Sequence, residues 1–176
     1  VVSFERNHRL WNYGPLTALA ARPTPIRRPD HVFAENDGME GIAAAPNGSW
    51  RVAGESGGIW DCRPAACTTV VAPPETAMAD GDLRITGMDR DPSGQGWFVV
   101  QRSYRPPIDV RAQVRRLSPD GTLGPALVSL KLPGVTDNFE GVAAETRNGR
   151  TRLYILSDDN GNPLQKTLLL AFDVAG

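Results

Sequence analysis

The stretch Asp37-Gly38-Met39-Glu40-Gly41-Ile42-Ala43-Ala44 recurs further along the chain as Asp137-Asn138-Phe139-Glu140-Gly141-Val142-Ala143-Ala144. A weaker copy, Leu83-Arg84-Ile85-Thr86-Gly87-Met88-Asp89, lies between them. The glycines of the three copies, at positions 41, 87 and 141, are 46 and 54 residues apart. A sequence that repeats at such an interval is typical of a fold built from similar units.

Each copy is followed by a turn and then by an apolar segment that ends in polar residues. The turns are Pro46-Asn47-Gly48, Pro92-Ser93-Gly94 and Arg147-Asn148-Gly149. The apolar segments are 52–55, 98–101 and 153–158, and residues 1–5 are a fourth example. Third strands are expected at 9–11, 58–60, 113–117 and 167–170, and outer strands at 68–71 and 126–130.

Three or four strands in a period of about 45 to 55 residues are typical of the blades of a β-propeller. We expect an all-β fold with about three and a half blades of a ring of about six. The expected division is a partial blade over 1–30, blades over 31–73 and 83–131, and a C-terminal blade over 137–176. The alternative, a β-sandwich, leaves the Glu-Gly repeat unexplained.

An incomplete ring leaves two large apolar blade faces in contact with water. We therefore expect the N-terminal blades to be missing from this chain. The remaining blades are expected to come from the same gene product or from another chain.

The composition excludes several classes of protein. The 176 residues include 19 Lys+Arg and 20 Asp+Glu, for a net charge of −1, which argues against nucleic acid as the partner. The longest apolar run, residues 168–172, is far too short for a membrane span. The 18 glycines and 15 prolines indicate many turns, so a helical bundle is not expected.

The two cysteines, Cys62 and Cys67, enclose Arg63-Pro64-Ala65-Ala66. A short loop with a proline suits closure by a disulfide, which implies an oxidising compartment. Two free thiols are the alternative, since two cysteines alone cannot complete a zinc site.

Four stretches of the chain carry a resemblance to a known family. They are Val2-Ser3-Phe4-Glu5-Arg6-Asn7-His8-Arg9, residues 137–141, Ser157-Asp158-Asp159-Asn160 and residues 162–172. These stretches resemble the C-terminal part of the bacterial phytase-like domain, which is described as "esterase-like activity of phytase". The resemblance covers nearly the whole chain and implies a propeller, a periplasmic or secreted location, and a phosphoester or ester hydrolase. Two positions depart from the family pattern, with Gln101 where a glutamate is expected and Gly161 where an aromatic residue is common.

Carboxylates recur where inner strands begin and where second strands end. Glu40 and Glu140 begin inner strands, while Glu5, Glu55 and Asp158 end second strands. In antiparallel strands these positions lie at the same edge of the sheet, so the oxygen atoms are expected to gather on one face of the propeller. Carboxylates brought together repel one another unless they are protonated or bound to a cation, and calcium prefers oxygen ligands. We therefore expect a calcium site made of Glu40, Asp137, Glu140, Asp158 and Asn160.

The same face supplies candidates for catalysis and for substrate binding. Glu40, Glu140, Asp158 and His8 are the expected catalytic residues. Arg6, Arg102 and Arg105 follow second-strand ends and are expected to bind the charge of the substrate.

Structural roles are the alternative for each of these residues. The glutamates would then lock adjacent blades together, 158–160 would form an Asx turn, His8 would cap a hairpin, and the arginines would pair with the carboxylates. Two functions follow from the two interpretations. The first is metal-assisted hydrolysis of a small phosphate or other ester, and the second is a non-catalytic propeller that binds a ligand or a protein.

Overall fold

The computed structural model describes residues 1–15, 17, 20–105 and 109–174. No α-helix occurs among them, and no helix that could cross a membrane is found in these ranges. The regular structure consists of β-strands and one short 3-10 turn, η2 (Pro46–Gly48). The prediction of an all-β fold is confirmed.

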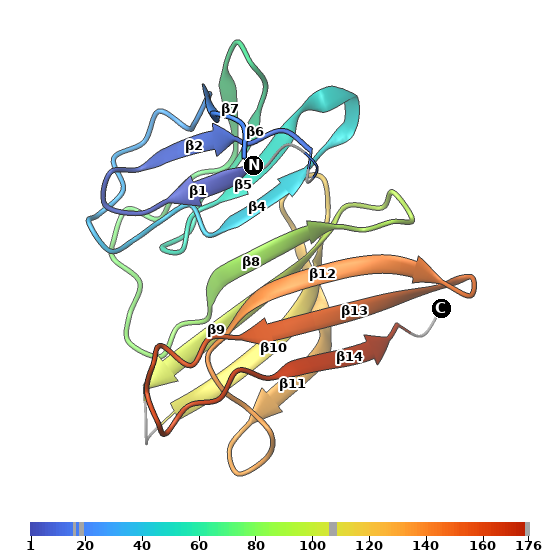
Figure 1. Ribbon diagram of the computed structural model, residues 1–176. Helices are drawn as coiled ribbons and strands as arrows, with labels where there is room; N and C mark the ends of the chain where they lie inside the picture. The colour runs from blue at the N-terminus through green and yellow to red at the C-terminus, as the bar shows by residue number, and fades with distance from the viewer. Residues whose placement is uncertain (16, 18–19, 106–108, 175–176) are drawn as a thin grey trace.

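The strands form four sheets, in which all neighbouring strands are antiparallel (Figure 1). The first sheet contains β1 (Val2–Phe4), β2 (Arg9–Asn12) and β3 (Thr24–Ile26). The second contains β4 (Gly41–Ala44), β5 (Trp50–Ala53), β6 (Ile59–Cys62) and β7 (Cys67–Val71). The third contains β8 (Arg84–Arg90), β9 (Trp97–Arg105), β10 (Asp109–Leu117) and β11 (Leu123–Lys131). The fourth contains β12 (Phe139–Arg147), β13 (Arg150–Ser157) and β14 (Leu169–Asp173).

Successive sheets therefore follow the repeat, as the sequence predicts. The order of strands in each sheet is the order in the chain, so every connection within a sheet is a simple return. The short strand β3 was not predicted, because Pro25 lies at its centre. β3 pairs only with β2 and is an edge strand, where a residue without an N–H group is tolerated.

The first strand of the third sheet, β8, packs between the first strands of the second and fourth sheets, β4 and β12 (Figure 1). The repeated glycines permit this approach. A Cβ atom on Gly87 would overlap the carbonyl oxygen of Glu140, and one on Gly41 would lie 3.1 Å from the Cγ2 atom of Ile85 in β8. At Gly141 the nearest atom, the Cβ of Leu156, is 3.4 Å away, which is an ordinary contact. The repeat in sequence thus has a steric cause at two of its three positions.

Each pair of consecutive sheets encloses its own apolar cluster. The cluster between the first and second sheets contains Leu10, Trp50, Val52 and Trp60. The next contains Ala53, Met88, Trp97, Val99 and Leu117, and the last contains Phe98, Val114, Phe139, Leu153 and Ile155. Trp50, Trp60 and Trp97 are therefore buried between sheets, whereas Trp11 is half-buried. Sheets that pack one after another in chain order, with an apolar cluster between each pair, have the arrangement of propeller blades. The closure of the ring and its number of blades stay predictions.

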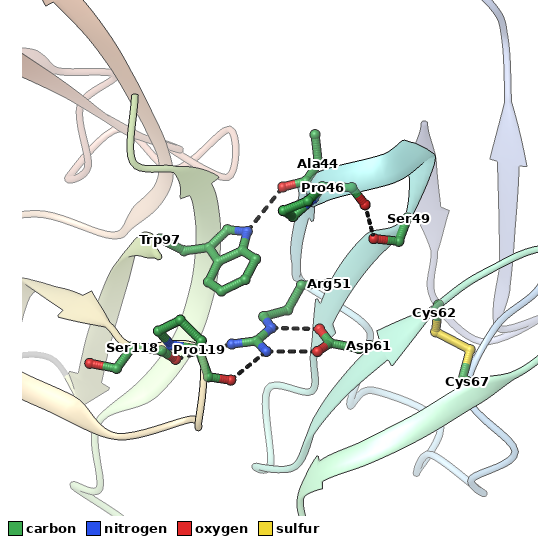
Figure 2. Close-up of polar contacts among 10 residues, drawn as sticks. All are labelled: Ala44, Pro46, Ser49, Arg51, Asp61, Cys62, Cys67, Trp97, Ser118 and Pro119. Atoms are coloured by element: carbon green, nitrogen blue, oxygen red, sulfur yellow. Dashed lines mark hydrogen bonds and ion pairs between the residues drawn. A yellow bond between two sulfur atoms is a disulfide. The ribbon is translucent and has the colours of Figure 1, made fainter. Parts of the chain in front are cut away.

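A buried arginine joins the second sheet to the third (Figure 2). The side chain of Arg51 is 1% exposed and donates to both carboxylate oxygens of Asp61, at 2.7 and 2.9 Å. It also donates to the carbonyl oxygens of Ser118 and Pro119, at 3.1 and 2.7 Å, across the sheet interface. Its guanidinium lies 3.8 Å from the ring centre of Trp97, whose indole N–H donates to the carbonyl oxygen of Ala44. These contacts hold the two sheets together at the end of the strands where β5 begins.

Cys62 and Cys67 form the predicted disulfide, which joins the end of β6 to the start of β7. The two residues are also cross-strand neighbours in the sheet. The intervening loop is closed by a hydrogen bond from the backbone N–H of Arg63 to the carbonyl oxygen of Ala66, at 2.8 Å. A disulfide in this position fits an oxidising compartment.

Candidate functional site

Four glutamates and one arginine gather where the inner strands begin, and every sheet contributes to the group. Glu5 follows β1, Glu40 precedes β4, Glu55 follows β5 and Glu140 is the second residue of β12. Arg102 lies in β9 of the third sheet. We call Glu5, Glu40, Glu55, Arg102 and Glu140 the carboxylate cluster. The cluster lies at the edge that strand polarity predicts.

Arg102 is the cation of the cluster. One of its terminal nitrogens lies 3.2 Å from an oxygen of Glu140 and 3.9 Å from an oxygen of Glu55. The side chains of Arg102 and Glu55 are 19% and 12% exposed. The Nε atom of Arg102 is buried and has no hydrogen-bond partner.

Glu40 holds a proton at neutral pH. Burial, the charge of Glu55 and a hydrogen bond to Glu5 raise its pKa from 4.5 to about 9, while Arg102 opposes this shift. Burial also raises the pKa of Glu55, and Arg102 lowers it. The Oε2 atom of Glu40 is buried without a hydrogen-bond partner. Burial is the largest cause of this shift, and the neighbouring glutamates add to it.

Asn138 supports Glu140 from the preceding loop. Its side chain is 2% exposed, and its amide nitrogen donates to Glu140 Oε1 at 2.7 Å. The Oδ1 atom of Asn138 is buried without a partner, like Glu40 Oε2 and Arg102 Nε. Buried polar atoms are almost always paired, so two acceptors and one donor left without partners mark a place for an ion, a ligand or water.

Three of the predicted ligands, in the loops before β12 and after β13, take part in hydrogen bonds with loop backbone. Asp137 accepts from the backbone N–H groups of Asn138 and Lys166, at 2.8 and 2.9 Å. Asp158 is exposed and accepts from the N–H of Asn160 at 2.9 Å, so the Asx turn is present. The N–H of Asp158 donates to the carbonyl oxygen of Asn138, which holds this loop beside the carboxylate cluster. A role for Asp137, Asp158 and Asn160 as metal ligands stays a prediction.

The remaining candidates lie around the cluster. Arg6 is exposed in the turn between β1 and β2, where its φ is 59°, and Arg105 is exposed at the end of β9. Neither forms an ion pair with another described residue. His8 Nε2 lies 2.9 Å from the carbonyl oxygen of Ala34, and the imidazole packs 5.5 Å from the ring of Phe33. This contact ties the first hairpin to the next segment, and the catalytic role of His8 stays a prediction.

The position where the family has a glutamate is filled by a neutral pair. Gln101 is buried and accepts from Gln113 at 3.0 Å, while its own amide lies 3.4 Å from the carbonyl oxygen of Leu83. Gln101 therefore forms hydrogen bonds at this position without adding a further charge to the cluster.

Glu5, Glu55 and Asn138 were not among the predicted catalytic, substrate-binding or metal-binding residues. The strand-end rule places both glutamates on this face, and the repeat aligns Asn138 with Gly38. Burial, which depends on how the sheets pack, separates Glu55 and Asn138 from the exposed Asp158. Glu5 is exposed, and its hydrogen bond with Glu40 places it in the cluster. Arg84 and Asp37 form an ion pair at the margin of the cluster, with 3.3 Å between a terminal nitrogen of Arg84 and an oxygen of Asp37. The charges of these two side chains offset each other.

The donor chemistry of the cluster fits calcium, which prefers carboxylate and amide oxygens. The two unpartnered acceptors, Glu40 Oε2 and Asn138 Oδ1, are oxygens of this kind. However, no group of three or more His, Cys, Asp or Glu side chains in the described ranges is positioned to hold a metal ion. A cation would therefore require the glutamates to draw closer together and Arg102 to move away from Glu140.

Comparisons with known proteins give one structural and one family match. No curated protein matches the chain. A crystal structure of an oxidoreductase (glucose dehydrogenase) from Thermus thermophilus is 20% identical, with a TM-score of 0.43. The match covers 68% of this chain and 36% of that protein, so this chain spans little more than a third of its length. Residues 1–161 match the family described as phytase-like, esterase-like activity of phytase. Because this match covers most of the chain, the protein belongs to the phytase-like family.

Proposed function

We propose that the carboxylate cluster binds a cation, with calcium as the ion, and takes part in the hydrolysis of a small phosphate or other ester. The observation that carries this proposal is the half-buried Glu40, whose buried Oε2 atom has no partner among three further glutamates and one arginine. The membership in the phytase-like family supports hydrolysis as the reaction class.

The charge of the cluster favours a cation as the missing partner. Four carboxylates face one guanidinium, and a proton on Glu40 offsets part of the excess. A divalent cation offers more favourable charge compensation than a proton, and its ligands must be ionised. We therefore expect cation binding to displace the proton from Glu40.

The proposed ligands are Glu40, Glu140 and the side-chain oxygen of Asn138, with Glu5 and Glu55 close by. Asp137, Asp158 and Asn160 remain proposed as outer members of the site. Support for including them is the hydrogen bond from the N–H of Asp158 to the carbonyl oxygen of Asn138, at 3.0 Å, which brings the loop to the edge of the cluster.

The chain's own residues would bind the substrate and move the proton. When bound, calcium neutralises substrate oxygens and makes water more acidic. Arg102 offers its unpartnered Nε–H to an anionic oxygen of the ester, and Arg6 and Arg105 are proposed to add charge at the rim. An ionised carboxylate of Glu40, Glu140 or Asp158 takes the proton of the attacking water, and the bond from phosphorus or acyl carbon to the ester oxygen breaks. His8 is proposed to return a proton to the leaving oxygen.

Thermal melts in calcium and in a chelator test the binding step, and release of p-nitrophenol from its phosphate and acetate esters tests the reaction. We expect calcium to raise the melting temperature of the wild-type chain, because a ligand that binds only the folded state stabilises it. Glu40→Gln is expected to abolish this rise and the hydrolysis. Glu35→Gln, which changes an exposed glutamate outside the cluster, is the matched control. No calcium effect in the wild type would overturn the proposed cation site.

A non-catalytic binding module is the second candidate. The observation that favours it is the contact of Arg102 with Glu140 and Glu55, because an arginine and a proton together offset part of the charge without a metal. In that case the cluster stabilises the packing of the sheets, and its face binds a ligand or a protein. A wild-type chain that neither responds to calcium nor cleaves either ester supports this candidate.

We further propose a periplasmic or secreted location, supported by the disulfide between Cys62 and Cys67. We also propose that further blades, from the same gene product or another chain, pack against the fourth sheet. Support comes from Leu156 and Leu169, cross-strand neighbours that are 46% and 66% exposed. Apolar side chains paired on an open sheet face are typical of a surface that another element covers.

A further inference from the structure

A pocket of about 270 Å³ lies between the second and third sheets, at the end of the strands opposite the carboxylate cluster. Arg51, at the start of β5, lies at this end, whereas Glu55 follows the end of the same strand. Its lining includes Arg51, Asp61, Trp97 and Pro119, which are labelled in Figure 2. Arg63 and Arg90 also line it. We call it the arginine pocket.

The charges that line the arginine pocket do not balance. Its ionisable lining residues are three arginines and one aspartate. Asp61 is already neutralised, because Arg51 donates to both of its carboxylate oxygens. Arg63 and Arg90 form no ion pair with any other described residue. Two guanidinium groups from different sheets thus line one small pocket without a counter-charge.

The backbone around these arginines is held in place. Arg63 follows Cys62 directly, and the disulfide to Cys67 closes its loop. The N–H of Arg63 donates to Ala66, so the loop is a hydrogen-bonded turn. Arg90 is the last residue of β8, and its N–H donates to the side chain of Asp89 at 2.7 Å. The fixed backbone keeps the two exposed arginine side chains next to the pocket.

Gly94 leaves one side of the arginine pocket open to a ligand, whereas Gly96 packs against the carbonyl oxygen of Leu117. Gly94 and Gly96 line it and have positive φ values, 82° and 129°. A Cβ atom on Gly94 would meet no atom within 4 Å, so the turn presents bare backbone next to open space.

We propose that the arginine pocket is a second binding site, for a phosphate-type oxyanion that bridges Arg63 and Arg90. Guanidinium groups match the geometry of phosphate oxygens and donate to them in pairs. The volume is just below the lower end of the range typical of small-molecule sites, about 300 Å³. It suits inorganic phosphate or the phosphate group of a small monoester. The proposal concerns residues on the opposite end of the sheets from the carboxylate cluster, so it does not depend on the proposed hydrolysis.

Titration of the full 176-residue chain with inorganic phosphate, in calcium-free buffer, tests this site. Amide chemical shifts in NMR spectra report both the affinity and the location. We expect the largest shifts at Arg63, Ala66, Gly94 and Gly96. The double variant R63Q/R90Q is expected to weaken phosphate binding at least tenfold, and each single variant less. Arg150→Gln, an exposed arginine in β13, is the matched control and should leave the affinity unchanged.

The outcomes separate this site from the carboxylate cluster. Arg102→Gln should not alter phosphate binding at the arginine pocket. Shifts centred on Gly38 and Glu55, or a loss of affinity in R102Q instead of R63Q/R90Q, would assign the phosphate to the cluster and overturn the proposal. Equal weakening by R150Q would show binding to surface charge in general, which also overturns it. The melting temperatures of R63Q/R90Q and of its two single variants should match the wild type, because neither Arg63 nor Arg90 makes a side-chain hydrogen bond to another described residue.

Discussion

Replacing Arg51 with methionine should destabilise the protein by about 3 kcal/mol. The substitution keeps a long apolar stem and removes every N–H that Arg51 donates to Asp61, Ser118 and Pro119. Removing one partner of a buried ion pair costs about 3–5 kcal/mol, because the other groups lose their partner away from water. Asp61 is 44% exposed and can be rehydrated, which places the cost at the lower end of that range.

Thermal unfolding followed by circular dichroism measures this cost. In a chain of this length, about 3 kcal/mol corresponds to a fall in melting temperature of about 6–12 °C. The matched control is Arg152→Met. Arg152 donates to both oxygens of Asp173, at 2.6 and 2.8 Å, in the same geometry as Arg51 and Asp61, but on the surface. An exposed pair contributes little, so this variant should melt close to the wild type.

A fall in melting temperature that is no larger for R51M than for R152M would refute the reasoning. It would mean that the contacts across the second and third sheets in Figure 2 do not hold them together. The arginine pocket gives a second readout, because R51M should also leave Asp61 as an unneutralised carboxylate and weaken phosphate binding there.

Three further predictions concern the glycine repeat, the disulfide and Glu40. Gly87→Ala should lower the free energy of unfolding by about 1–3 kcal/mol in chemical denaturation, because the added methyl group meets the carbonyl oxygen of Glu140. Gly141→Ala should be nearly neutral. Equal effects of the two substitutions would contradict the steric account. Reduction of Cys62–Cys67 should lower the free energy of unfolding by about 2 kcal/mol, the value that the chain-entropy relation gives for so short a loop. Urea titrations measure this change, and an unchanged unfolding midpoint would contradict the prediction. In a chelator, stability should fall as the pH rises from 4.5 to about 9, because folded Glu40 keeps a proton that the unfolded chain has lost. Glu40→Gln should flatten this part of the profile, and a wild-type profile that rises over the same range would show that Glu40 is ionised.

The architecture follows from the sequence because the repeat and the strand pattern agree. The spacing of Gly41, Gly87 and Gly141 predicts the units, and the alternation of turns and apolar segments predicts the strands within them. The short strand β3 was not predicted, because Pro25 argues against a strand. The proline is tolerated because β3 lies at the edge of its sheet. The disulfide was predictable because five positions separate two lone cysteines around a proline.

The site was only partly predictable. Strand polarity places Glu40 and Glu140 on one edge, and the charge interactions of Glu40 with Glu140 and Arg102 agree with this. The sequence could not rank Glu55 above Asp158, since both end second strands. Packing decides between them, because Glu55 is 12% exposed beside Arg102 whereas Asp158 is exposed in an Asx turn. The contacts of Arg51 were not predicted for a similar reason. Nothing in the sequence around Arg51 indicates that carbonyl groups of the next sheet lie within hydrogen-bonding distance of its side chain.

Calorimetric titration of calcium into the wild-type chain at pH 7, repeated in buffers with different heats of protonation, tests the proposed cation site most directly. The pKa of Glu40, raised to about 9, means that a cation which takes Glu40 as a ligand must release its proton. The account predicts one calcium bound per chain, about one proton released with it, and loss of both in Glu40→Gln. Calcium binding without proton release would place the ion elsewhere, and no binding at all would leave Arg102 and the proton as the partners of the cluster and contradict the proposed function.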